Sequence, residues 1–283
     1  MTVLGIASVR LSPGATSLAV GLSWTLPSPV TLIEADPEGG VIGPRFSLDD
    51  RRDLLTYGVD VRRGFEPDKL FANTTALGRV HCLLAPTNPP SAQRAVELTA
   101  GVLGENLPRY DMTSVVDLGC LTVNSPAIPL AMKVDRLLLV MRPYVESMHA
   151  LLNVLGMVRA WGVPTDLVVV GDRPFKAQEI AEVAAVPVAA VLSHDPRAAT
   201  AFSGGRFSSR LFRRSTLLRT VSALAVDLTV DSIKAQLGGG IEPHSAAPPP
   251  PPAPPPPPPP APPAAAQMAP ATTSLGVHLR GER

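Results

Sequence analysis

Small residues stand near the start of the chain at the spacing of a phosphate-binding loop. Within SVRLSPGATSLAVGLS at 8–23, Gly14, Ala15, Thr16 and Ser17 follow a short apolar run and precede a helical pattern. Such residues let backbone N–H groups curl around phosphates, and the next helix offers its positive end. A hydroxyl in the position of Thr16 is expected to bind Mg²⁺. The stretch predicts a phosphate-binding loop, with an ordinary strand–turn–helix connection as the alternative.

Two residues of this loop differ from those that phosphate transfer requires. Ala15 stands where such a loop carries a lysine, so both the charge and the donor are missing. Pro13 has no backbone N–H to offer to a phosphate. Phosphoryl transfer relies on positioning and charge stabilisation, and loss of a positive group at such a site lowers the rate by about 10³–10⁵-fold. Efficient hydrolysis is therefore not expected.

The elements that must hold this loop alternate between strand and helix patterns. Strands are expected at 2–8, 30–35, 80–86, 113–119, 135–141, 165–171 and 186–192, and helices at 15–25, 91–104, 124–132, 145–161, 175–184 and 207–236. Continuous apolar runs are typical of strands covered on both faces. The pattern predicts the α/β class, a mostly parallel twisted sheet with helices on both faces. The segment 32–79 interrupts the rhythm and is expected to form loops and short helices above the sheet.

The C-terminal region differs in composition from the rest of the chain. Many of the 33 prolines fall between 246 and 270, after a glycine run at 238–240. Such a segment lacks backbone donors and core-forming side chains, so it is expected to be extended or disordered. We predict a domain at 1–237 and a Gly/Pro-rich disordered tail at 238–283. The tail is either a passive spacer or a docking strip for an aromatic-lined groove on a partner protein.

Charge and hydropathy limit the classes of protein to which this chain can belong. The 283 residues carry a net charge of +1, which argues against nucleic-acid binding through overall charge. A local basic patch at Arg210, Arg213 and Arg214 leaves DNA as an alternative partner. No apolar run reaches the roughly 18–20 residues of a transmembrane helix, and the first residues do not look like a secretion signal. Cytoplasmic location is expected, and peripheral membrane contact through partners stays open.

Three segments together resemble the ParA/MinD family of deviant-loop ATPases. They are the residues 10–17, VTLIEADPEGG at 30–40 and RYDMTSVVDLG at 109–119, and their order and approximate spacing match the family. LLAPTNPPSA at 83–92, VDRLLLVMRPYVESMHAL at 134–151 and VAAVLSHDPRAATAFSGG at 188–205 look like later strand–loop segments of the same fold. The resemblance covers about residues 1–235 and implies a P-loop NTPase fold.

The resemblance assigns roles to individual side chains. Arg10 falls on the signature lysine that reaches phosphates across a nucleotide-sandwich dimer. Thr16 matches the magnesium ligand, and Glu34 and Asp36 match the acidic pair that orients the attacking water and the metal shell. Asp117 matches the Walker-B aspartate, a second metal-linked residue, with a plain strand-end residue as the alternative.

The family also implies ligands. Gly14, Ala15, Thr16 and Ser17 would contact nucleotide, and ATP with Mg²⁺ is expected to bind weakly; the other outcomes are no nucleotide at all and a competent ATPase in which Arg10 replaces the lysine. Gly171 and Asp172 stand where an asparagine commonly contacts adenine, so base recognition is expected to differ.

The family implies proteins that dimerise and position cargo, in chromosome partitioning, division-site placement or pilus assembly. We expect a homo- or heterodimer that acts as a scaffold or regulator with a degenerate nucleotide site, and VVDLG and LLAPTNPPSA look most like the CpaE-like pilus-assembly branch. An active nucleotide-switched ATPase and a DNA-binding partition protein are the alternatives.

Overall fold

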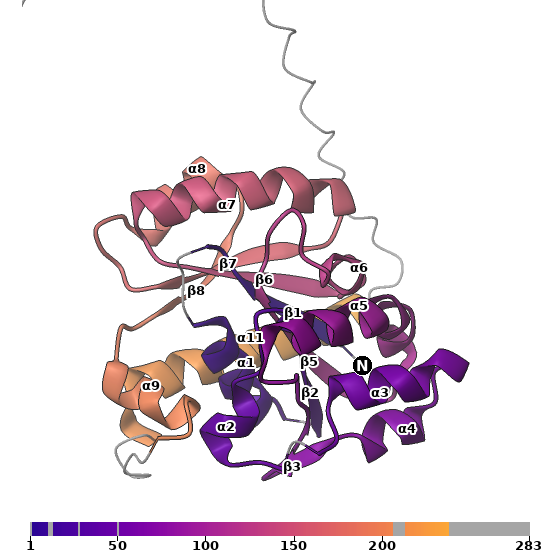
Figure 1. The fold of residues 1–283 in the computed structure, drawn as a ribbon. Helices are drawn as coiled ribbons and strands as arrows, with labels where there is room; N and C mark the ends of the chain where they lie inside the picture. Colours follow the sequence, from indigo (N-terminus) through magenta and orange to yellow (C-terminus); the bar gives the residue numbers. More distant parts are fainter. Residues whose placement is uncertain (1, 11–13, 28, 50, 206–212, 238–283) are drawn as a thin grey trace, which may run out of the picture. The chain divides into compact units, whose positions relative to one another are not determined.

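Eight strands form one sheet in the computed structural model, which describes residues 2–10, 14–27, 29–49, 51–205 and 213–237 (Figure 1). The strands are β1 Val3–Ser8, β2 Val30–Glu34, β3 Thr75–Leu77, β4 Val80–Leu83, β5 Thr113–Cys120, β6 Arg136–Met141, β7 Thr165–Val170 and β8 Val188–Leu192. Their order is β3-β4-β2-β5-β1-β6-β7-β8, and only the β3–β4 pair is antiparallel. The predicted α/β class with a mostly parallel sheet is confirmed.

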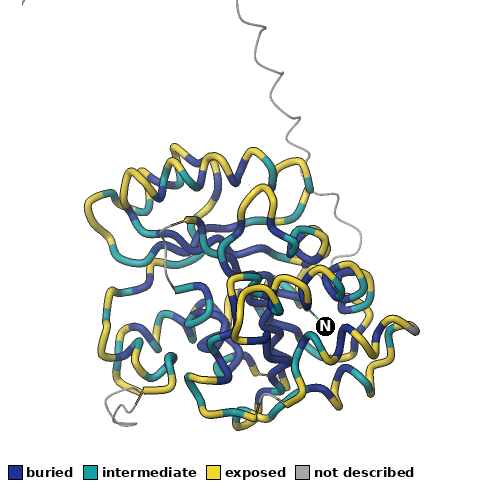
Figure 2. The backbone as a smooth tube through the Cα atoms, viewed as in Figure 1, coloured by how far each residue is buried: buried dark blue, intermediate teal, exposed yellow. Residues whose placement is uncertain are grey.

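Helices cover both faces of this sheet. One face packs against α1 Ala15–Thr25, α2 Ile42–Phe46, α9 Pro196–Phe202 and α11 Thr216–Leu237. The other face packs against α3 Leu54–Asp60, α5 Pro89–Asn106, α6 Ile128–Ala131, α7 Val145–Val158 and α8 Ala177–Ala184. Alternate residues of β1 divide between the two cores, as strand geometry requires: Val3 and Ala7 face one, Leu4 and Ile6 the other. Figure 2 shows the resulting buried strands between helices with exposed outer sides.

The segment between β2 and β4 contains short elements. Beyond α2 and α3, these are a 3-10 turn at Val61–Arg63, α4 Pro67–Ala72 and the edge strand β3. Two further 3-10 turns, Leu107–Arg109 and Arg159–Trp161, extend α5 and α7. Within the described part of the chain, no helix has both the length and the apolar character to cross a bilayer.

Two predicted helices differ from those observed. The helix expected at 124–132 is reduced to α6, Ile128–Ala131, because Pro126 and Pro129 cannot continue a helix that begins before them. The helix expected over 207–236 is interrupted: Arg213 and Arg214 are helical, Ser215 is not, and α11 then begins at Thr216. Residues 206–212 lie outside the described part of the chain. The predicted tail at 238–283 also lies outside it.

Two elements were not predicted. β3 has three residues and lies at the edge of the sheet, so it carries little apolar pattern. α9 did carry a local signal: Asp195 caps it by accepting a hydrogen bond from the Ala198 N–H at 2.9 Å, and Pro196 occupies its first position. Its short apolar pattern was hidden within a loop-like stretch.

Candidate functional site

The turn after β1 leads directly into α1. Gly14 is the N-cap of α1 with φ 133°, a conformation that side-chain-bearing residues rarely adopt. Its carbonyl accepts the Leu18 N–H at 2.9 Å, which begins the helical ladder. No side-chain cap bond forms among the described residues, and the first turn contains no acidic residue. The N–H groups of this turn, at Ala15, Thr16 and Ser17, therefore lack intrahelical acceptors and present positive potential.

Ala15 contributes nothing polar to this turn. Its side chain is 4% exposed and belongs to the apolar core formed with the sheet and α11. Residues 11–13, including Pro13, lie outside the described residues. The first turn of α1 thus has backbone dipoles and hydroxyls but no ammonium group from position 15.

Sheet register places two acidic residues opposite each other where β2 ends and β5 continues. Glu34 of β2 is paired with Asp117 of β5, and Asp117 is also opposite Ile6 of β1. The carboxyl ends of these strands open beside the α1 turn, which is where open α/β sheets bind ligands.

Asp117 is the buried carboxyl of this group. Burial raises its pKa to about 7, the Thr16 hydroxyl opposes that shift, and the charges of Glu34 and Asp36 reinforce it. Its Oδ1 accepts the Gly119 N–H at 3.2 Å, whereas its buried Oδ2 has no hydrogen-bond partner among the described residues. An unpaired buried oxygen beside a hydroxyl is a suitable position for a cation or a water.

Glu34 has a different environment. Its Oε1 accepts the N–H groups of Val41 at 2.7 Å and Ile42 at 2.9 Å, and its Oε2 accepts the Ala85 N–H at 3.1 Å. The side chain is buried, which raises its pKa, while the three backbone bonds act against that rise. Both oxygens are therefore committed to fixing the start of α2 against the end of β4. The geometry supports a positioning role better than the predicted contact with water.

Asp36 lies on the more open side of the same edge. It is partly buried, and its Oδ1 accepts the Glu38 N–H at 2.9 Å. Burial raises its pKa, the Glu38 N–H bond lowers it, and the Glu38 charge raises it further. Its carboxyl group lies against Gly119, where the pairing of β1 with β5 is shifted by a bulge. Of the predicted acidic pair, Asp36 is the member whose oxygens remain partly accessible.

Arg10 lies in an exposed turn after β1. Burial raises the pKa of the half-buried Cys120 thiol, and the Arg10 charge acts weakly against that rise. Arg10 therefore belongs to the same edge of the sheet as Asp36 and Cys120. It is placed outside the cavity described next.

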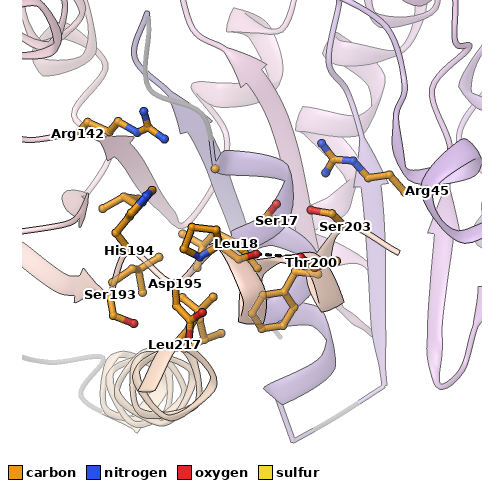
Figure 3. Close-up of a pocket in the computed structure, with 17 residues that line it drawn as sticks. Ser17, Leu18, Arg45, Arg142, Ser193, His194, Asp195, Thr200, Ser203 and Leu217 are labelled. Carbon is orange, nitrogen blue, oxygen red and sulfur yellow. Dashed lines mark hydrogen bonds between the residues drawn. The ribbon is translucent and has the colours of Figure 1, made fainter. Parts of the chain in front are cut away.

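A cavity of about 480 Å³ extends from the α1 turn toward the ends of β7 and β8 (Figure 3). Gly14, Ser17 and Leu18 line one side of it. The opposite wall comes from the ends of β7 and β8 and from α9 and α11, and includes Val170, Leu192, Ser193, His194, Asp195, Phe202 and Leu217. Its wall is mainly apolar, with polar groups at the rim, which suits a ligand with a flat or apolar body and a charged end.

Sequence reasoning missed two cationic residues of this cavity. Arg45 comes from α2 and Arg142 from the end of β6, and Figure 3 shows their guanidinium groups pointing toward each other across the α1 turn. The β7 end contributes Val170; Gly171 and Asp172, which replace the expected asparagine, do not line the cavity. Neither arginine has a local motif around it, because the two segments meet only through the fold.

The described residues contain no group of three or more His, Cys, Asp or Glu side chains arranged to hold a metal by themselves. Asp117 and Thr16 are close together, but Glu34 is committed to backbone amides. Of the predicted basic patch, Arg213 and Arg214 are exposed, and Arg210 lies outside the described residues.

The fold is similar to that of ParA- and MinD-type ATPases of known structure. Similar solved structures are a ParA family ATPase from Chlorobium tepidum (TM-score 0.68, 16% identity, 80% of this chain and 98% of that chain) and MinD from Pyrococcus horikoshii with Mg-ADP (0.67, 17%, 83% and 99%). McdA from Cyanothece in complex with ATP is a third (0.62, 17%, 81% and 96%). At these identities the likeness establishes the fold. No protein-family model and no curated protein matches the chain.

Proposed function

We propose that this protein is a scaffold or regulator that positions a larger assembly, with a degenerate nucleotide site that binds ATP and Mg²⁺ weakly and hydrolyses ATP slowly. One observation carries the proposal. The α1 turn keeps its unpaired N–H groups and its neighbour Asp117, while the position of the loop lysine is filled by an alanine whose side chain is packed in the core. Binding by backbone dipoles survives such a change better than catalysis does.

The residues at the α1 turn fit this ligand. Gly14, Ala15, Thr16 and Ser17 would offer N–H groups and hydroxyls to the phosphates, and the cavity beside Ser17 would receive the nucleoside. Thr16 and Asp117 would hold Mg²⁺, whose remaining ligands would be phosphates and waters, because Mg²⁺ commonly binds through one or two protein groups. Bound Mg²⁺ would neutralise phosphate charge. Asp36 would orient water at the open side of the metal shell.

The similar structures support the nucleotide part of the proposal. MinD was solved with Mg-ADP and McdA with ATP, and both share this fold. We propose that the process is division-site placement, partitioning or pilus assembly. We prefer the CpaE-like pilus-assembly branch because of the sequence of β5 and of the loop after β4. Dimerisation, with Arg10 directed at the phosphates of a facing subunit, is part of the same proposal.

We further propose that the domain ends near 237 and that the segment 238–283 links it to a protein partner. Its proline content suits an extended strip that an aromatic-lined groove can bind. Attachment to a membrane would then occur only through such partners.

Titration and turnover measurements test the nucleotide proposal. Purified full-length protein is titrated with fluorescent ATP and ADP, with and without Mg²⁺, and phosphate release is followed at saturating ATP. We expect binding in the micromolar-to-millimolar range and turnover far below the 1–10³ s⁻¹ of ordinary enzymes. Turnover within that ordinary range would contradict the degenerate site. Absence of binding at millimolar nucleotide would contradict a nucleotide function.

DNA binding is the second candidate function, because Arg213 and Arg214 are both exposed. Retention of DNA that falls steeply with salt, and that Arg213→Ala combined with Arg214→Ala weakens, would support it. If DNA is not retained, or is retained regardless of salt, DNA binding is excluded as a function.

A further inference from the structure

We propose that Arg45 binds the phosphate group of a nucleotide in the cavity beside α1 and supplies from α2 the positive charge that position 15 lacks. The inference rests on the proposed function and adds to it a ligand-contacting residue and a charge requirement. Three features of Arg45 support this role: the surroundings of its guanidinium group, the contacts that fix its backbone and its place relative to the α1 turn.

The guanidinium of Arg45 is incompletely paired. Arg45 is half-buried, and its Nη1 is fully enclosed without a hydrogen-bond partner among the described residues. The ion pairs found among those residues involve other side chains. A cationic donor enclosed without a partner is costly, and because Arg45 also lines the cavity, a small shift of its guanidinium toward the cavity would let a ligand complete the pairing. The guanidinium fork matches a phosphate in shape and charge.

The backbone of Arg45 is fixed from two sides. Its N–H donates to the Val41 carbonyl at 3.0 Å, within the turn whose N–H groups are held by the Glu34 carboxyl. On the other side, the chain after α9 passes so close to the Arg45 carbonyl that a Cβ on Gly204 would overlap it. Arg45 therefore projects from a held backbone and not from a free loop.

Aromatic packing anchors the neighbouring residue. The Phe46 ring meets Trp24 of α1 edge-on, with 5.6 Å between ring centroids, and Trp24 contacts Phe202 of α9 with centroids 5.8 Å apart. These contacts tie α2 to α1 and α9, the two helices that border the cavity. The arginine is thereby held in register with the α1 turn.

The opposite rim of the cavity carries a second cation, Arg142. In Figure 3 the two guanidinium groups face each other with Ser17 and the start of α1 between them. Two arginines and a helix N-terminus lie around the cavity, which the Asp195 carboxylate also borders, and the rest of the wall is mainly apolar. This combination selects a ligand with a phosphate at one end and an uncharged body, which is the chemistry of a nucleoside phosphate.

The test compares Arg45→Met with Arg197→Met in the full-length protein. Arg197 is exposed on α9 and does not line the cavity, so its replacement removes the same charge without the contact. We expect Arg45→Met to raise the Kd for Mg-ATP and Mg-ADP about ten- to hundredfold and Arg197→Met to leave it within about twofold. Arg45→Lys should fall between the parent and Arg45→Met, since charge is kept but the fork is lost.

Two further measurements separate a contact from a loss of structure. Arg45→Met should unfold at or above the parent temperature without ligand, because it removes an enclosed guanidinium nitrogen that has no partner among the described residues. Adenosine, which has no phosphate, should bind the parent and Arg45→Met equally. Equal loss of adenosine and Mg-ATP binding would indicate a collapsed cavity and would overturn the proposal.

The outcomes also distinguish this inference from the proposed function. If the parent binds nucleotide and Arg45→Met binds it equally well, the role of Arg45 is wrong and the nucleotide function stands. If the parent binds inorganic phosphate but no nucleotide, and Arg45→Met abolishes that binding, the nucleotide function and the nucleotide ligand are both wrong, although an anion contact remains. Absence of both forms of binding overturns both proposals.

Discussion

The carboxyl group of Asp36 rests directly on the Cα of Gly119, so that a Cβ at position 119 would overlap Asp36 Oδ1. Gly119 has φ +63° and lies at the bulge where β5 pairs with β1. Through this contact the loop after β2 is placed over the end of β5, two residues beyond Asp117. The open acidic side chain of the site is therefore positioned by the absence of a side chain on the neighbouring strand.

Replacement of Gly119 by alanine should disturb this contact. Gly78→Ala is a matched control, because Gly78 has nearly the same φ, +64°, and a Cβ at that position would have no atom within 4 Å. We expect Gly119→Ala to lower the free energy of unfolding by about 2 kcal/mol more than Gly78→Ala, since overlap is added to backbone strain. Urea unfolding measures this difference. Equal losses would show that Asp36 moves away at no cost.

The raised pKa of Asp117 predicts a pH-dependent stability. With a folded pKa of about 7 against an ordinary value of 3.8, the native state holds a proton that the unfolded state has released between those values. The free energy of unfolding must therefore fall as pH rises from about 4 to about 7. Asp117→Asn should lose less stability than the parent between pH 5 and pH 8, by on the order of 2 kcal/mol. Parallel pH profiles for the two proteins would exclude this shift.

Glu34 should act on ligand binding through α2. Because its oxygens hold the N–H groups of Val41 and Ile42, Glu34→Gln sets a side-chain NH₂ against backbone donors, and we expect a loss of about 2 kcal/mol in stability. If the same turn positions Arg45, Glu34→Gln should weaken Mg-ATP binding in the parent and have little further effect in Arg45→Met. A double-mutant cycle measures this coupling. Strictly additive effects would show that Glu34 does not act on binding through Arg45. Glu97→Gln, in the exposed ion pair with Arg94, is the control and should leave binding unchanged.

Local patterns were sufficient for part of this site. Gly14 and the helix from Ala15 to Thr25 follow from small residues between an apolar run and a helical pattern, and the structure has that helix with the same ends. The place of Asp117 within a buried strand also follows from the apolar run around it. These features depend on residues close together in the chain.

Other features depend on contacts that no local pattern contains. The role predicted for Glu34 beside Asp36 stays a prediction. Its carboxyl group accepts the N–H groups of residues 41, 42 and 85, and residue 85, just beyond β4, is far from it in the sequence. Arg45 and Arg142 meet at one cavity from segments almost a hundred residues apart. Pro126, Pro129 and Ser215 interrupt the helices that apolar spacing predicts at 124–132 and 207–236, because apolar spacing does not mark where a helix ends.

Restoring a lysine at position 15 tests the central feature of the proposed site. Ala15→Lys places an ammonium group at the start of α1, and Ala15→Met adds a side chain of similar length without charge. The Ala15 Cβ is buried, so both variants must first be shown to fold by their thermal transitions. If the missing charge limits the site, Ala15→Lys should bind Mg-ATP at least about tenfold more tightly and release phosphate faster, whereas Ala15→Met should do neither. If both variants fold and behave alike, the alanine is not the limiting defect, and the losses must be sought in the rest of the loop. If Ala15→Lys improves binding without turnover, the site has lost the alignment of water and metal as well as the charge, and Asp36 is the next residue to examine.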